Sequence, residues 1–111
     1  MDHRVTLKKN YEFKRLYDKG KSAVTPYMVV YCRRTGSSVN RVGYTVSTKL
    51  GKAVVRNRIR RRLREIYRLA LPALRPGVDI VIVARSKSVG AQYAQLESAF
   101  LRACEKLGIL K

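Results

Sequence analysis

The fold of this chain is decided by one stretch, residues 52–68, which reads KAVVRNRIRRRLREIYR. Apolar residues recur with the spacing of one helix face, at Val55, Ile59, Leu63, Ile66 and Ala70. The opposite side of the helical wheel carries Asn57, Arg60, Arg61, Arg64 and Arg68, flanked by Arg58 and Arg62. The spacing predicts an amphipathic helix that begins near Ala53 or Val54, ends before Pro72 and exposes a face of guanidinium groups.

Such an arginine face is unfavourable on its own, because like charges four residues apart on a helix repel each other. A polyanion would neutralise it, and the planar guanidinium group binds phosphate oxygens in pairs and stacks on bases. A merely solvated face is the alternative, but such faces usually mix charges, and Glu65 is the only acid here. Lys and Arg number 25 against 7 Asp and Glu, a net charge of +18. Helix and composition together indicate binding to nucleic acid.

The length of 111 residues suits one domain with a modest core, and 46% hydrophobic residues predict that it folds. We therefore expect a single RNA-binding domain over residues 1–111. Cys32 and Cys104 have apolar neighbours and no metal-ligand spacing, which predicts buried free thiols in a reducing cytoplasm. No signal-peptide pattern and no apolar stretch of membrane length occurs, so no membrane association is expected.

Two strands are predicted between the N-terminus and the arginine helix. Residues 22–34 and 39–47 alternate apolar and polar side chains, as strands with one apolar face do. If the two strands pair, four side chains share an open face: Tyr31, Arg33, Arg41 and Thr45. Aromatic and cationic side chains on a sheet suit single-stranded RNA, although Tyr and Thr are also ordinary strand residues.

Helices are expected at both ends of the chain. The first covers residues 11–19, with Asn10 as its N-cap and Gly20 as its stop. Its aromatic residues Phe13 and Tyr17 suit either the core or a cleft that stacks on bases. The last covers residues 91–107 and ends at Gly108; its core face carries Leu96, Phe100, Ala103 and Leu107.

Residues 78–84, VDIVIVA, are almost continuously apolar, which predicts a buried central strand. The whole layout indicates an α+β fold with helices packed on a sheet.

Protein-based catalysis finds little support in the sequence. The acids are scattered, without the spacing of a carboxylate pair or a metal cage. The single histidine, His3, lies at the N-terminal end, and no glycine-rich phosphate loop or nucleophile motif occurs. The chain is therefore expected to bind RNA rather than to cleave it with its own side chains.

Residues 41–65, RVGYTVSTKLGKAVVRNRIRRRLRE, resemble the bacterial ribonuclease P protein component family. The family hallmark is an Arg-Asn-Arg segment after a small residue, followed by further basic positions on a helix. Arg56-Asn57-Arg58 fits it, with Ala53 before and Arg60 after. The segments LKKN at 7–10 and IVAR at 82–85 and the closing helix are also similar, so the resemblance covers nearly the whole chain.

The resemblance implies a small cytoplasmic subunit of a heterodimer-like ribonucleoprotein, an endonuclease that removes the 5′ leader of precursor tRNA. The RNA subunit would carry the active site and its Mg²⁺, and the protein alone would bind no cofactor. The implied fold is a four-stranded sheet packed with three helices in αβββαβα order. Its left-handed βαβ crossover, of the ribosomal protein S5 domain 2-like type, contradicts the usual right-handed preference.

The resemblance also implies two groups of site residues. The RNA-binding motif, which Lys52 and Arg68 extend along the same basic face, comprises Lys52, Arg56, Asn57, Arg58, Arg60, Arg61, Arg64 and Arg68. The leader cleft comprises Phe13, Tyr17, Tyr31, Thr45 and Lys49. Tyr17 stands where Phe is common, and Met28 at a strand position that is often aromatic.

Three other functions are weighed against this one. A general, ribosomal-type RNA-binding protein would share the charge but show no leader preference. A protein-only nuclease is disfavoured by the missing acid cluster. A cationic helix on a membrane surface would need the apolar face that the strands require for a core.

Overall fold

The computed structural model describes residues 6–111, so the prediction for His3 lies outside the described residues. Its helices and strands follow one another as α1 (Asn10–Lys19), β1 (Lys21–Val24), β2 (Met28–Arg34), β3 (Arg41–Thr45), α2 (Ala53–Ala70), β4 (Val78–Ala84) and α3 (Tyr93–Leu107). Short 3-10 turns occur at η2 (Thr48–Leu50), η3 (Leu71–Ala73) and η4 (Ser86–Ser88). The αβββαβα order is therefore confirmed.

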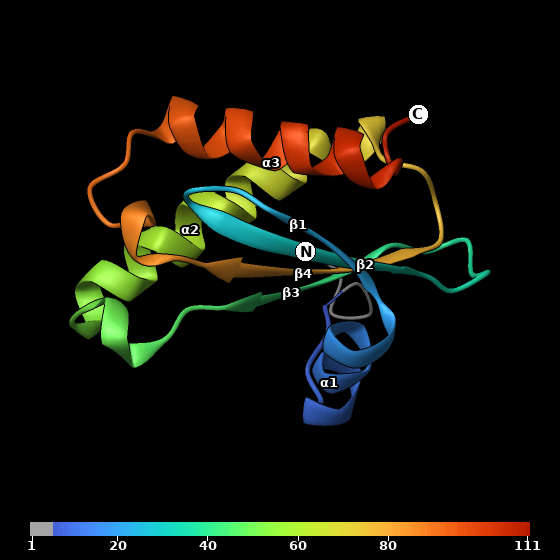
Figure 1. Cartoon of the computed structure of the whole chain (residues 1–111), viewed down its shortest axis with the longest axis horizontal. Coiled ribbons are helices and arrows are strands. Elements are labelled where there is room, and N and C mark those ends of the chain that lie inside the picture. Colours follow the sequence, from blue (N-terminus) through green and yellow to red (C-terminus); the bar gives the residue numbers. More distant parts are fainter. Residues whose placement is uncertain (1–5) are drawn as a thin grey trace.

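The four strands form one mixed sheet in the order β1-β2-β4-β3. β4 lies inside the sheet, antiparallel to β2 and parallel to β3, which confirms the predicted central strand. Figure 1 shows α2 and α3 on one face of the sheet and α1 on the other. The parallel strands β3 and β4 are joined through α2 by a left-handed crossover, as the resemblance implies.

The larger core lies between the sheet and the pair α2 and α3. Alternate residues of β2 and β4, including Val30 and Ile82, are fully buried against the apolar face of α2. The predicted stripe of α2 is buried at Ile59, Leu63, Ile66 and Ala70, and partly buried at Val55. Tyr67 is also buried, beside the stripe that the spacing predicted.

A second, smaller core holds α1 against the opposite face of the sheet. Its fully buried side chains are Leu7, Leu16 and Val81, and the partly buried residues around them include Phe13 and Tyr31. α1 also makes two polar contacts with β3, a hydrogen bond through Tyr17 and an ion pair through Glu12.

The prediction of one strand over residues 22–34 is wrong, because a turn at Thr25-Pro26-Tyr27 divides it into β1 and β2. Thr25 Oγ1 accepts hydrogen bonds from the backbone N–H groups of Tyr27 and Met28, which stabilises the turn. Pro26 has no backbone N–H, so it cannot donate a hydrogen bond to a neighbouring strand. The predicted pairing of this segment with 39–47 is also wrong. β4 lies between β2 and β3, so Tyr31 and Thr45 share a face without being on neighbouring strands.

Two helix starts differ from the prediction by one or two residues. Asn10 is the first residue of α1, and the N-cap is Lys9, whose backbone N–H donates to Glu12 Oε1 at 3.1 Å. α3 begins at Tyr93 rather than residue 91, because the N–H of Gln92 donates to Gln95 Oε1 at 2.9 Å and fixes the helix start there. Its end at Gly108, with φ of 72°, is as predicted.

Cys32 and Cys104 are buried free cysteines, as expected. Across residues 6–111, no helix is both long and apolar enough to cross a membrane.

Candidate nucleic-acid interface

The arginine face of α2 points away from the sheet because the apolar stripe of the same helix is buried against it. The exposed members of the predicted motif are Lys52, Asn57, Arg58, Arg61, Arg64 and Arg68, and Arg56 and Arg60 are partly exposed. The structure thus presents the eight residues of the motif on the surface of one helix and its N-cap.

Few of these guanidinium groups are neutralised within the described residues. Arg68 pairs with Glu65 at 2.5 Å, and it is the only α2 arginine with an acidic partner there. This hydrogen bond from Arg68 holds the pKa of Glu65 below its usual value. Arg56 Nε donates to the carbonyl of Gly51 at 3.1 Å. The face therefore retains a large positive field that favours polyanions.

Arg62 differs from its neighbours because its side chain is used within the fold. Its Nη1 donates to the carbonyl oxygen of Ala91 at 2.8 Å, which ties α2 to the segment before α3. This contact explains why a residue in the middle of the arginine run does not belong to the exposed motif.

A groove of about 480 Å³ lies beside α1 and β3 and reaches α2. It is lined by Lys8, Asn10, Phe13, Lys14, Tyr17, Tyr44, Thr45, Val46 and Arg60. Three of the five predicted cleft residues are among them, and Arg60 joins the groove to the arginine face. A larger hollow of about 630 Å³, between the β1–β2 turn and α3, contains none of the predicted site residues, so we assign the site by its chemistry and not by cavity size.

Phe13 forms the floor of this groove through a close approach to β3. A Cβ atom on Gly43 would lie 2.5 Å from Phe13 Cζ, so only glycine leaves room for the ring there. The ring is at the same time part of the small core under α1. Phe13 therefore both packs in the small core and lines the groove.

Tyr17 and Thr45 face each other across the groove. The Tyr17 hydroxyl and Thr45 Oγ1 are 2.9 Å apart and share a hydrogen bond. The ring of Tyr31 lies edge-on to that of Tyr17, with centroids 4.9 Å apart. Tyr31 thus supports Tyr17 from the sheet without lining the groove itself. Lys49 is exposed in η2 and also lies outside the groove lining.

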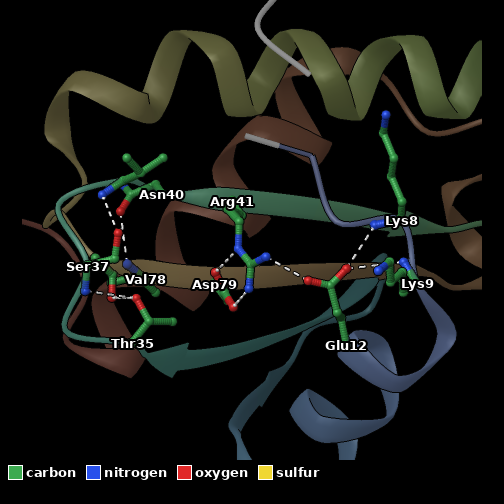
Figure 2. A network of polar contacts seen from close by, with 11 residues as sticks. Lys8, Lys9, Glu12, Thr35, Ser37, Asn40, Arg41, Val78 and Asp79 are labelled. Atoms are coloured by element: carbon green, nitrogen blue, oxygen red, sulfur yellow. Dashed lines mark hydrogen bonds and ion pairs between the residues drawn. The ribbon is translucent and has the colours of Figure 1, made fainter. Parts of the chain in front are cut away.

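A charged network that the sequence analysis missed lies beyond the groove (Figure 2). Arg41 donates through Nε and Nη2 to both oxygens of Asp79, at 3.0 and 2.7 Å, and through Nη1 to Glu12 Oε2 at 2.6 Å. The hydrogen bonds to Asp79 raise the pKa of Arg41, although burial acts against this. Arg41 lies on the predicted face of the sheet with its side chain 36% exposed, but its guanidinium is engaged there by two acids.

Comparison with known proteins identifies the family of this chain. The family model described as Ribonuclease P matches residues 1–108. The chain belongs to the ribonuclease P protein family. The family match covers all three features described above: the left-handed crossover, the Arg-Asn-Arg segment on α2 and the groove beside α1.

Relatives and solved structures agree with this assignment. The ribonuclease P protein component of Alkaliphilus oremlandii is 41% identical over 104 residues, which are 94% of this chain and 91% of the relative. That of Natranaerobius thermophilus is 39% identical over 111 residues, covering 100% of this chain and 96% of the relative. The RNase P protein of Staphylococcus aureus superposes with a TM-score of 0.87 at 30% identity, covering 96% and 98% of the two chains. For the RNase P protein of Thermotoga maritima, the TM-score is 0.80 at 31% identity, with coverage of 87% and 92%.

Family membership makes the chain a protein partner of the ribonuclease P RNA and places it in tRNA processing. Over residues 6–111, no group of three or more His, Cys, Asp or Glu side chains could hold a metal ion. The chemistry that the described side chains support is contact with RNA, through cations on α2 and aromatic rings beside β3.

Proposed function

We propose that this chain binds the catalytic RNA of ribonuclease P through the arginine face of α2 and holds the 5′ leader of precursor tRNA in the groove between α1 and β3. The observation that carries the proposal is Arg60, which lines the groove and belongs to the arginine face. One continuous surface can therefore contact the catalytic RNA and the substrate together.

The contribution of the arginine face is electrostatic. Two RNA molecules repel each other through their phosphates, and arginines placed between them replace part of the counterion atmosphere. The protein should therefore lower the Mg²⁺ concentration needed for binding and cleavage. Cleavage itself belongs, in this proposal, to the RNA subunit and its Mg²⁺, and no protein side chain is assigned a catalytic role.

The groove suits a single strand of RNA. Phe13 and Tyr17 offer aromatic surface to unpaired bases, and three cations surround them, namely Lys8, Lys14 and Arg60. Stacking on these rings requires bases that are not paired, so the groove favours an unpaired leader over a duplex. Precursor tRNA should therefore bind better than mature tRNA, in the cytoplasm where we expect the complex to act.

Cleavage of precursor tRNA at low Mg²⁺ tests the subunit function in three parallel reactions: ribonuclease P RNA alone, protein alone, and both together. We expect cleavage only with both. Cleavage by the protein alone would contradict the assignment of chemistry to RNA, and no effect of the protein would contradict the cofactor function.

Binding measurements test the leader groove. The dissociation constants of the RNA–protein complex for precursor and mature tRNA should differ, and the difference should shrink as the leader is shortened. Equal affinities would favour the alternative, a general RNA-binding protein without leader preference. The salt dependence should be steep, with a slope of log affinity against log salt near −5 if about six phosphates are contacted.

A further inference from the structure

The position of α1 sets the shape of the groove, because α1 provides four of its lining residues: Asn10, Phe13, Lys14 and Tyr17. The apolar contact that holds α1 to the sheet is small, with Leu16 as its only fully buried residue. Polar contacts between α1 and the strands must therefore contribute much of its orientation.

Two polar contacts join α1 directly to β3, one at each end of the strand. At Thr45, the last residue of β3, the contact is the hydrogen bond to Tyr17. At Arg41, the first residue, it is the ion pair with Glu12. Tyr17 and Thr45 line the groove, so RNA that enters it competes for their hydroxyl groups. Glu12 and Arg41 lie outside the groove lining, so RNA that enters the groove does not compete for their contact.

The Glu12–Arg41 contact is connected to β4, the buried central strand of the sheet. The two other nitrogens of the Arg41 guanidinium, Nε and Nη2, donate to Asp79 of the central strand β4, which is 3% exposed. Glu12 in turn accepts through Oε1 from the backbone N–H groups of Lys9, at 3.1 Å, and Lys8, at 3.4 Å. Figure 2 shows this line of contacts from β4 through Arg41 to the start of α1.

We propose that Glu12 and Arg41 are positioning residues, which fix the start of α1 and the groove residue Lys8 relative to β3 and thereby determine preference for leader-bearing tRNA. The inference rests on the proposed function of the groove. Without this anchor, the remaining polar contact of α1 with β3 would be a hydrogen bond for which the leader competes, so binding the leader would carry an extra cost of ordering α1.

Glu12→Gln tests the anchor with little disturbance, because glutamine keeps the size of the side chain and an oxygen that accepts from the Lys8 and Lys9 N–H groups. The ion pair of Arg41 with Asp79 also remains. Glu105→Gln is the matched control, since it changes the net charge equally at an exposed position of α3. Both variants are assayed as full chains assembled with ribonuclease P RNA.

The preference for precursor over mature tRNA should fall about fivefold in Glu12→Gln, as for loss of one partly exposed ion pair, and remain unchanged in Glu105→Gln. Affinity for ribonuclease P RNA should not fall in either variant, because the arginine face is intact and the net charge has risen. A merely structural defect would weaken both binding steps. An unchanged preference in Glu12→Gln, with a wild type that discriminates, would overturn the positioning function.

Amide hydrogen exchange of the free protein tests the anchor independently of tRNA. We expect faster exchange in α1 of Glu12→Gln and unchanged exchange in α2 and α3. Unchanged exchange in α1 would overturn the anchor whatever the RNA measurements give. A wild type without leader preference would instead reject the proposed leader binding, while faster exchange in α1 would still support the anchor.

Discussion

Asp79 is the charged residue that the described part of the fold buries most completely, at 3% exposure. Its carboxylate is balanced by the two-point contact with Arg41. Asp79→Asn should lower the free energy of unfolding by about 2–3 kcal/mol, because Arg41 then lacks a charged partner in the sheet, although its part-exposed side chain can still reach water and Glu12. Urea denaturation measures the loss.

Asp18→Asn is the control for Asp79→Asn. Asp18 is exposed on α1, so the same chemical change should alter the free energy of unfolding by less than about 0.5 kcal/mol. Equal effects of the two substitutions would mean that the buried pair contributes nothing specific.

Gly43 is required by the ring that lies on it rather than by its backbone conformation. In Gly43→Ala the new methyl group would meet Phe13 at 2.5 and 2.8 Å, so the ring must move away from β3. We expect a loss of about 1–3 kcal/mol in unfolding free energy and weaker binding of precursor tRNA. Thermal unfolding and precursor binding measure the two effects.

The double variant Gly43→Ala with Phe13→Leu separates crowding from other causes. The smaller leucine side chain leaves room for the methyl group, so stability should be partly restored relative to Gly43→Ala alone. If the second substitution only adds to the loss, the contact between ring and strand is not the reason for glycine at this position.

The arginines of α2 have two different roles: exposed ones are available to RNA, and Arg62 stabilises the fold. Arg64→Gln should weaken binding to ribonuclease P RNA and make the salt slope shallower by about 1, with unfolding unchanged, because the side chain is exposed. Arg62→Gln should instead lower the unfolding free energy by about 1 kcal/mol through loss of its bond to Ala91. Salt titrations and thermal unfolding of both variants check the division, and an unfolding loss in Arg64→Gln would contradict it.

The elements themselves were largely predictable because their signals are local. The periodicity of residues 53–70 and the apolar run at 78–84 correctly predicted α2 and the central strand. Strand order was not predictable from such signals, since β4 enters between β2 and β3 from far along the sequence. The turn at Pro26 carried a local signal that the alternating pattern of residues 22–34 obscured.

The candidate site shows the same division. The arginine face follows from helical spacing. Local patterns made Phe13, Tyr17 and Thr45 candidates, the resemblance assigned them to one cleft, and only the fold brings them to one groove. The Glu12–Arg41–Asp79 network joins residues that are 29 and 38 positions apart. No local sequence pattern connects these three residues, so sequence alone does not predict that Glu12 and Asp79 share Arg41 as a partner.

For the whole molecule, Glu12 links stability to pH. Burial acts to raise its pKa, but the hydrogen bonds from Lys9 and Lys8 and the charge of Arg41 outweigh burial and hold the pKa of Glu12 below its usual value. A carboxylate with a lowered pKa in the folded state stabilises the protein above its unfolded pKa, and this contribution is lost as pH falls through the folded pKa.

The free energy of unfolding of the wild type should therefore decrease below about pH 4.5 more than that of Glu12→Gln, so that the two curves converge in acid. Urea denaturation between neutral pH and pH 3 measures the convergence. A constant difference between the two proteins over this range would mean that the charge of Glu12 does not contribute to stability.

The position of β4 in the sheet also constrains how the protein can be made. β4 is the last strand in the sequence but sits between β2 and β3, and the apolar face of α2 packs on a core that includes it. During translation, α2 therefore emerges from the ribosome before the strand that completes its packing surface. The sheet can close only after residue 84 has been synthesised, so the nascent chain carries its basic segment through the exit tunnel and past ribosomal RNA before the domain is folded.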